Sequence, residues 1–107
     1  MRAGQLRNQI EIHRPVDTPD GLGGYTRSWV KISNGDAWAQ IHGLRGQERM
    51  EAMQNDQRLD AVIRMRFRDD IRPEYRIIHG KQVYEIVSMI NVDLRNVMLE
   101  LTVREVI

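Results

Sequence analysis

Alternation of apolar and polar residues with a period of two recurs along this chain, and it is clearest at residues 61–68. There the odd positions carry apolar side chains, whereas the even positions include Arg64, Arg66 and Arg68. A period of two places successive side chains on opposite faces of a β-strand. The stretch therefore predicts a strand with one apolar, buried face and one basic face.

The same reasoning predicts about seven strands, at residues 9–13, 25–31, 37–42, 59–68, 76–78, 82–90 and 97–104. Residues 16–24 are rich in Asp, Gly and Pro, which favours a long exposed loop. Residues 33–36, Ser-Asn-Gly-Asp, predict a turn between the two strands that carry Trp29 and Trp38. The turn at residues 79–81 joins two strands into a hairpin.

Residues 44–57 differ from the rest because they contain no β-branched residue and many straight-chain helix formers. We expect one short helix there. Its apolar side is thin, with Leu44, Met50 and Met53 as the main contributors. An isolated helix of fewer than about fifteen residues is marginal in water, so this helix must either pack against a neighbour or be mobile.

Many strands without a repeating β-α order argue against a doubly wound parallel sheet. The expected fold class is mainly β, a small antiparallel β-barrel or sandwich of about seven strands with one short helix. At 107 residues the chain suits one domain, residues 1–107, because a second core could not be filled from the remaining residues.

The charge balance and the lack of cysteine exclude several functions. Sixteen Lys and Arg oppose fifteen Asp and Glu, so long-range attraction to nucleic acid is not evident. The absence of cysteine excludes disulfides, thiolate nucleophiles and cysteine-based metal sites. No apolar run approaches the ~20 residues of a membrane helix, and no signal peptide is evident, so we expect a cytosolic chain without a membrane partner.

No pattern in the sequence indicates catalysis, a cofactor or a metal site. The three histidines, His13, His42 and His79, lie on three different predicted segments, which is not how convergent metal ligands are spaced. Asp69 and Asp70 sit beside arginines in a predicted turn, where ion pairing is the expected role. We therefore predict that the chain is not an enzyme.

The arginine row is the feature most open to a functional interpretation. Arg64, Arg66 and Arg68, with Arg72 close by, could bind an adjacent subunit or an acidic neighbour, or contact phosphates. Alternatively, the row is a solvated strand face that prevents edge-to-edge pairing. No aromatic residues alternate with these arginines to stack on bases.

Several stretches, in order and spacing, resemble the bacteriophage head–tail joining family, also called head-closure or stopper proteins. The resemblance spans nearly the whole chain, although no single motif is diagnostic. The stretches are residues 1–7, 10–15, Gly23-Gly24, Trp29, 37–41, Leu44, Gly46, Glu48, 63–68, Ile71, Pro73, 76–77 and 80–86.

This resemblance implies a β-barrel-like virion protein of the head–tail neck, assembled in the host cytoplasm. It implies a homo-oligomeric ring, expected to be twelvefold, beneath portal and adaptor ring proteins. The ring would retain packaged DNA without sequence specificity and offer a docking surface to tail proteins. The channel gate would be the segment 43–57, with residues Gly43, Leu44, Gly46, Gln47, Glu48, Met50, Met53 and Gln54.

Two other functions stay open at this point. One is a different neck or tail-end ring protein, such as a tail terminator, because these share small size and β-rich architecture. The other is a small β-barrel that binds nucleic acid through the arginine face, for which a steep salt dependence of affinity would be the signature.

Overall fold

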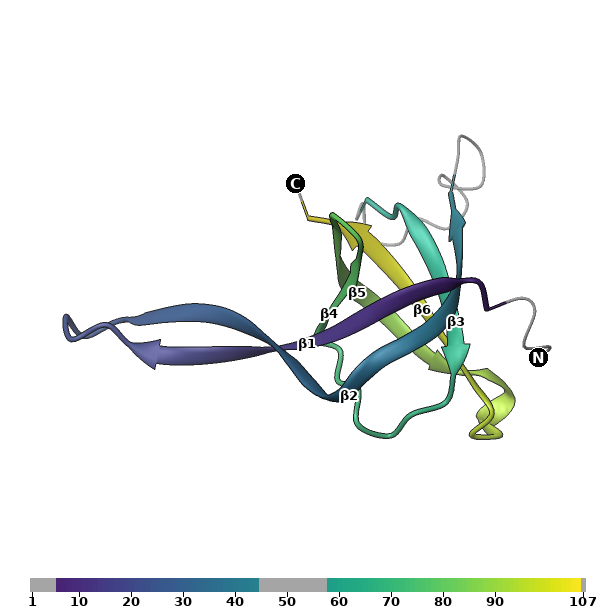
Figure 1. Cartoon of the computed structure of the whole chain (residues 1–107), viewed down its shortest axis with the longest axis horizontal. Helices are drawn as coiled ribbons and strands as arrows, with labels where there is room; N and C mark the ends of the chain where they lie inside the picture. The colour runs from purple at the N-terminus through teal and green to yellow at the C-terminus, as the bar shows by residue number, and fades with distance from the viewer. Residues whose placement is uncertain (1–5, 45–57, 107) are drawn as a thin grey trace.

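The computed structural model describes residues 6–44 and 58–106. These residues form six strands and one short 3-10 helix (Figure 1). The sheet neighbours are all antiparallel, and the sheet closes on itself in the order β1-β2-β3-β6-β5-β4. The elements are β1 (Asn8–Pro19), β2 (Tyr25–Gly43), β3 (Ala61–Arg66), β4 (Arg76–His79), β5 (Gln82–Asn91), η2 (Val92–Leu94) and β6 (Met98–Glu105). The predicted mainly β fold is thus confirmed.

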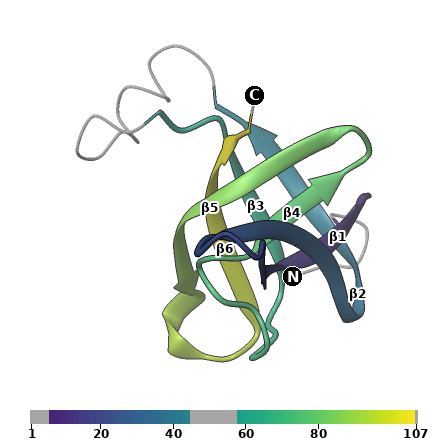
Figure 2. The same ribbon diagram turned by 90° about the vertical axis from the view of Figure 1, so that its left-hand side faces the viewer.

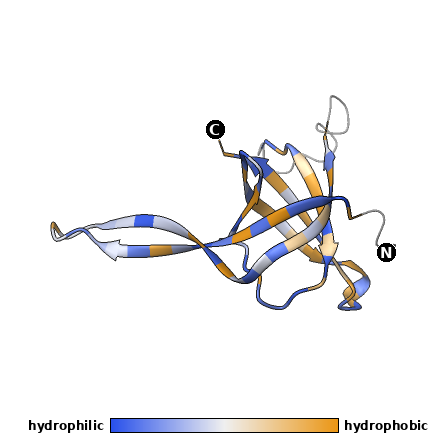
Figure 3. Ribbon diagram, viewed as in Figure 1, coloured by the Kyte–Doolittle hydropathy of each residue, from blue (hydrophilic) through white to orange (hydrophobic). Residues whose placement is uncertain are grey.

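The core of the barrel is formed by the apolar positions of the alternating pattern. In β3, Ile63 and Met65 are buried whereas Arg64 and Arg66 are exposed, as the period of two predicts. Figure 3 shows the same alternation of apolar and polar positions along the barrel strands. The largest fully buried side chains are Ile10, Ile12, Ile63, Met65, Ile77, Leu101 and Val103. Val97, the first residue of the strand predicted at 97–104, is 54% exposed and precedes β6.

The turn predicted at residues 33–36 was wrong, because β2 continues through it. Glu11 of β1 pairs with Asp36, and His13 pairs with Lys31, so Ile12 alone lies opposite residues 32–35. The extra residues form a bulge in β2, with Asn34 in the left-handed region at φ 53°. Two predicted strands are therefore one, and the described residues contain six strands, where about seven were expected.

The long loop predicted at residues 16–24 was also wrong in extent. Residues 14–19 of β1 pair with residues 25–30 of β2, and only residues 20–24 form the connection. The last pairing of β1 with β4 is His13 with Arg76, so beyond it the two strands leave the barrel as an arm (Figure 1). Figure 2 shows the barrel from the side that carries this arm. Pro15 and Pro19 are tolerated because both arm strands have a free edge.

The helix predicted at residues 44–57 cannot be compared with the structure beyond its first residue, because residues 45–57 lie outside the described part. Leu44 is buried, and its backbone N–H donates to the carbonyl oxygen of Asp60 at 2.9 Å. Residues 91–96, between the last two predicted strands, contain the short helix η2.

Replacement of Gly35 by alanine tests whether the β2 bulge requires a close approach of the two backbones. A Cβ at Gly35 would lie 2.8 Å from the Ile32 carbonyl oxygen and 3.0 Å from that of Ile12. We expect Gly35→Ala to lower the free energy of unfolding by about 1–3 kcal/mol, measured by urea denaturation. Gly43→Ala is the control, because a Cβ there meets nothing within 4 Å. Equal stability of the two variants would contradict the proposed packing of the bulge.

Candidate assembly interface

The predicted arginine row does not act as one uniform basic face. Arg64 on β3 lies opposite Glu100 on β6, and its Nε donates to Glu100 Oε2 at 3.1 Å. This cross-strand pair neutralises the charge within the sheet, where opposite charges on facing residues stabilise strand pairing. Arg72 donates from Nη1 to the carbonyl oxygen of Asp69 at 2.8 Å and so belongs to its own turn.

Arg68 joins the loop after β3 to the bulge of β2. Its guanidinium donates to both carboxylate oxygens of Asp70, at 2.9 and 2.8 Å, and to the carbonyl oxygen of Asn34 at 2.6 Å. The hydrogen bonds from Arg68 lower the pKa of the Asp70 carboxyl, and the same bonds raise the pKa of Arg68. The expected ion-pair role of Asp70 is thus confirmed, and Arg68 supports the strand geometry.

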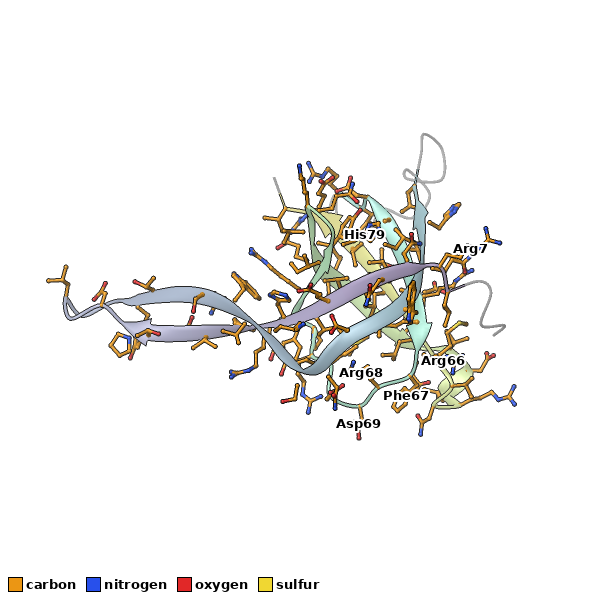
Figure 4. All side chains as sticks on the ribbon, viewed as in Figure 1. Arg7, Arg66, Phe67, Arg68, Asp69 and His79 are labelled. Carbon is orange, nitrogen blue, oxygen red and sulfur yellow. The ribbon has the colours of Figure 1, made fainter. Side chains whose placement is uncertain are left out.

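Arg66 differs from the other arginines of the row. Within the described part of the chain it makes no hydrogen bond or ion pair, and its side chain is exposed. It lines an open pocket of about 510 Å³ on the barrel wall, and Figure 4 shows Arg66 on the side away from the arm. The described residues that line this pocket are Leu6, Ala37, Trp38, Met65, Arg66 and Arg68. An apolar pocket beside an arginine that makes no hydrogen bond to the described residues suits a partner with an apolar group and a hydrogen-bond acceptor.

The tip of the arm is an ordered loop that exposes apolar side chains. Asp20 Oδ1 accepts the backbone N–H groups of Leu22 at 2.7 Å and Gly24 at 3.1 Å. Gly21 and Gly23 have φ of 81° and 88°, a conformation that L-residues rarely adopt, so the loop depends on glycine at both positions. Between them, Leu22 is 91% exposed.

The arm is braced along its length and at its base. Arg27 on β2 donates to both carboxylate oxygens of Asp17 on β1, at 2.8 and 3.1 Å, and this lowers the pKa of Asp17. At the base, the guanidinium of Arg76 from β4 lies 4.0 Å from the centre of the Trp29 ring, a cation–π contact to the barrel. The first contact joins the two arm strands, and the second links the base of the arm to β4.

Leu44, near the start of the predicted gate segment (residues 43–57), bonds to Asp60, and the residues just after the segment, Arg58 and Asp60, bond to β6. Besides the bond from Leu44, the Asp60 N–H donates to the Val103 carbonyl oxygen at 2.9 Å. Arg58 donates to the Glu105 carbonyl oxygen at 2.7 Å and pairs with Asp60. Of the predicted gate residues, Gly43 ends β2 and Leu44 is buried, whereas Gly46, Gln47, Glu48, Met50, Met53 and Gln54 lie outside the described residues.

The described residues hold no arrangement typical of a metal site. No group of three or more His, Asp or Glu could hold an ion in this part of the chain. His13 contacts Glu11 at 3.0 Å between Nε2 and Oε1, and His79, labelled in Figure 4, ends β4 just before the hairpin turn into β5. Among the helices that the structure describes, none has the length and apolar character needed to span a bilayer.

Two solved structures share this barrel fold. The solution structure of protein SF1141 from Shigella flexneri 2a is 23% identical, with a TM-score of 0.73, covering 98% of this chain and 96% of that one. A chain in the virion of a native gene transfer agent particle is 23% identical, with a TM-score of 0.68, covering 94% and 96%. No match was found among curated protein sequences.

The fold is therefore that of a small antiparallel barrel, and one of the structures that share it comes from a virion. The family comparison is more specific, because the model of the phage head completion protein family matches residues 1–106. The chain belongs to this family. Its role is therefore that of a structural component of the phage particle at the completion of the head, and family membership indicates a structural function and not catalysis.

Sequence reasoning missed the arm and the pocket. The prolines at positions 15 and 19 hid the partner strand, since proline usually argues against a strand. The pocket could not be predicted, because its lining combines residues from the N-terminal segment, β2 and β3 and from the loop after β3.

Replacement of Asp70 by asparagine tests the Arg68–Asp70 pair through pH. A carboxyl whose pKa is lowered by folding stabilises the fold above its unfolded pKa of about 3.9, and the effect is lost as pH falls through the folded pKa. We expect Asp70→Asn to cost about 0.5–1 kcal/mol at pH 7, since Asp70 is partly exposed, and little near pH 2. Asp93→Asn is the control. A deficit in Asp70→Asn that does not change with pH would contradict the pairing.

Proposed function

We propose that this chain forms a ring at the phage neck, between the portal and adaptor proteins and the tail. In this position the ring retains packaged DNA in the filled head and presents a docking surface to the tail. The observation that carries the proposal is the family match over residues 1–106, together with a resemblance to head-closure proteins. That resemblance supports twelve copies in the ring.

The architecture suits a protein that functions by contacting other subunits. The barrel buries its own core, whereas the arm buries little and extends about 20 Å beyond the last barrel pairing, at roughly 3.3 Å per residue. A braced two-stranded arm that ends in an exposed leucine has no evident use in an isolated barrel. It gains a use when a second protein covers its tip.

The charge distribution suits a ring through which DNA passes. The chain carries sixteen basic and fifteen acidic residues, and arginines of the row pair with Glu100 and Asp70. A ring multiplies the charge of each subunit, and a strongly basic channel would retain DNA that must leave later. The same pairing weakens the alternative of a nucleic-acid-binding barrel, because paired arginines have less to offer phosphates.

The gate remains a prediction from the resemblance. Leu44, inside the segment, and Asp60, just after it, are joined by a backbone hydrogen bond. The prediction is that residues 43–57 face the channel. The segment would then change its environment on ring assembly. Amide hydrogen exchange of the free chain and of assembled particles measures this change, and equal, strong protection in both states would count against the gate.

Removal of the protein from the particle tests the proposed function. Particles assembled without the chain are expected to package DNA but to lose most of it, because the portal channel stays open. Tails are expected to remain unjoined. Electron microscopy and nuclease protection measure both effects, and supply of the wild-type chain is the control. Filled, tailed particles at wild-type yield in its absence would sink the proposal.

Binding to separated particle parts distinguishes a neck ring from a tail terminator. The purified chain is expected to bind filled, tailless heads and restore their ability to accept tails. A tail terminator would bind isolated tails first. Sedimentation of the chain with each purified part is the measurement, and binding to tails alone would favour the alternative.

The arginines proposed to contact a neighbour are Arg64, Arg66, Arg68 and Arg72, and the contacts single out Arg66. We expect Arg66→Ala to change the free energy of unfolding by no more than about 0.5 kcal/mol, since its side chain is exposed and unpaired within the described residues. Incorporation into particles should nevertheless fall. Arg95→Ala, on the loop after η2, is the matched control. Wild-type incorporation of Arg66→Ala would remove this residue from the interface.

A further inference from the structure

We propose that the arm tip of one copy docks in the Arg66 pocket of the next copy. The arm tip is residues 20–25, and the Arg66 pocket is the one lined by Leu6, Ala37, Trp38, Met65, Arg66 and Arg68. The inference rests on the proposed function, because it assumes that copies assemble in the particle. It specifies which two surfaces of the chain meet and which side chains each surface contributes.

The arm tip offers an apolar knob with an acceptor beside it. Leu22 is 91% exposed and Tyr25 is 72% exposed, so two large side chains lie in water at the end of the arm. Asp20 uses Oδ1 to hold the loop, and among the described residues its Oδ2 has no hydrogen-bond partner. The tip is already ordered by Asp20 and two glycines, so docking would cost little conformational entropy.

The Arg66 pocket offers the complementary surface. Its walls are mainly apolar, from Leu6, Ala37 and Met65, and the Trp38 ring is 55% exposed at its side. Covering a large exposed aromatic ring with a leucine removes apolar surface from water on both partners. The guanidinium of Arg66, which has no partner in the described part of the chain, can donate to a carboxylate such as that of Asp20.

A second pocket of about 400 Å³ fits the tip less well. It lies between β2, β3 and the loop around η2, and its charged residues are Arg64, Asp93 and Arg95. Arg64 is already paired with Glu100, and the Asp93 carboxylate offsets the charge of Arg95 and would repel the acidic tip. Charge complementarity therefore selects the Arg66 pocket.

The placement of the two surfaces requires a second copy. The arm extends away from the barrel, and Arg66 lies on the opposite side of it (Figures 1 and 4). A tip therefore cannot reach the pocket of its own chain. A contact between two different surfaces of identical chains repeats from copy to copy, and it closes into a ring when the rotation between copies allows.

Cysteine cross-linking tests the contact in assembled particles, because the chain has no cysteine of its own. We expect the double variant Leu22→Cys with Ala37→Cys, treated with a short bis-maleimide, to give a ladder of multimers on a denaturing gel. Co-assembly of the two single variants should stop at dimers, since each copy then carries one thiol. Leu94→Cys with Ala37→Cys is the control and should give no ladder, because Leu94 belongs to η2, outside both the arm tip and the Arg66 pocket.

A failed cross-linking experiment can be interpreted separately for the docking and for the proposed function. No ladder in particles that contain the double variant at wild-type copy number would overturn the docking and leave the neck role intact. A link from Leu22→Cys to a different virion protein would overturn it as well. Absence of the wild-type chain from filled particles, checked first by mass spectrometry, would instead overturn the proposed function and with it the inference.

Competition for incorporation covers the case in which a cysteine variant fails to assemble. Wild-type and Leu22→Ser chains are supplied in equal amounts, and the copies in purified particles are counted by mass spectrometry. We expect Leu22→Ser to be reduced about ten-fold, the scale set by loss of one buried leucine contact. Leu94→Ser, at a leucine that is 86% exposed, should enter equally with wild type. Equal entry of Leu22→Ser would overturn the docking.

Discussion

The pairing of β1 with β2 is the interaction on which the rest of the structure depends. Up to His13, β1 lies between β2 and β4, so its hydrogen bonds close the barrel. Beyond His13 the same pairing continues without a third strand and forms the arm. One long antiparallel pair thus joins a closed core to a projecting element, and no hinge sequence separates them. The bulge opposite Ile12 lies at this transition and bends β2 there.

Much of the barrel could be predicted from the sequence because its strands obey one rule. Alternation at Ile63 and Met65, and again at Leu99, Leu101 and Val103, marks the buried face, and the structure buries these side chains. The rule reports which side faces the core and not which strand lies alongside. The strand order, with β6 between β3 and β5, therefore had to come from the three-dimensional structure.

Local sequence preferences for turns led to two wrong predictions with a common cause. Asn34-Gly35 is typical of a turn, yet the partner strand β1 stays paired on both sides, and the long-range pairing prevails over the local preference. Pro15 and Pro19 indicate a loop, yet an isolated two-stranded arm leaves proline a free edge. For the candidate interface, the arginines were visible in the sequence. Their partners Glu100 and Asn34 lie 36 and 34 residues away along the chain and could not be assigned.

Pairing inside the chain also explains why one arginine of the row suits a contact between chains. A guanidinium bonded to Glu100, or to Asp70 and Asn34, must lose those bonds before it meets another protein, which offsets the gain. Arg66 has no such bond among the described residues, so an incoming carboxylate replaces only its hydrogen bonds to water. The strand places it beside Met65 and Trp38, where water is displaced when a partner arrives. Desolvation strengthens a charge-assisted hydrogen bond only if the pair is complete, which makes this position selective for a partner that brings an acceptor together with apolar surface.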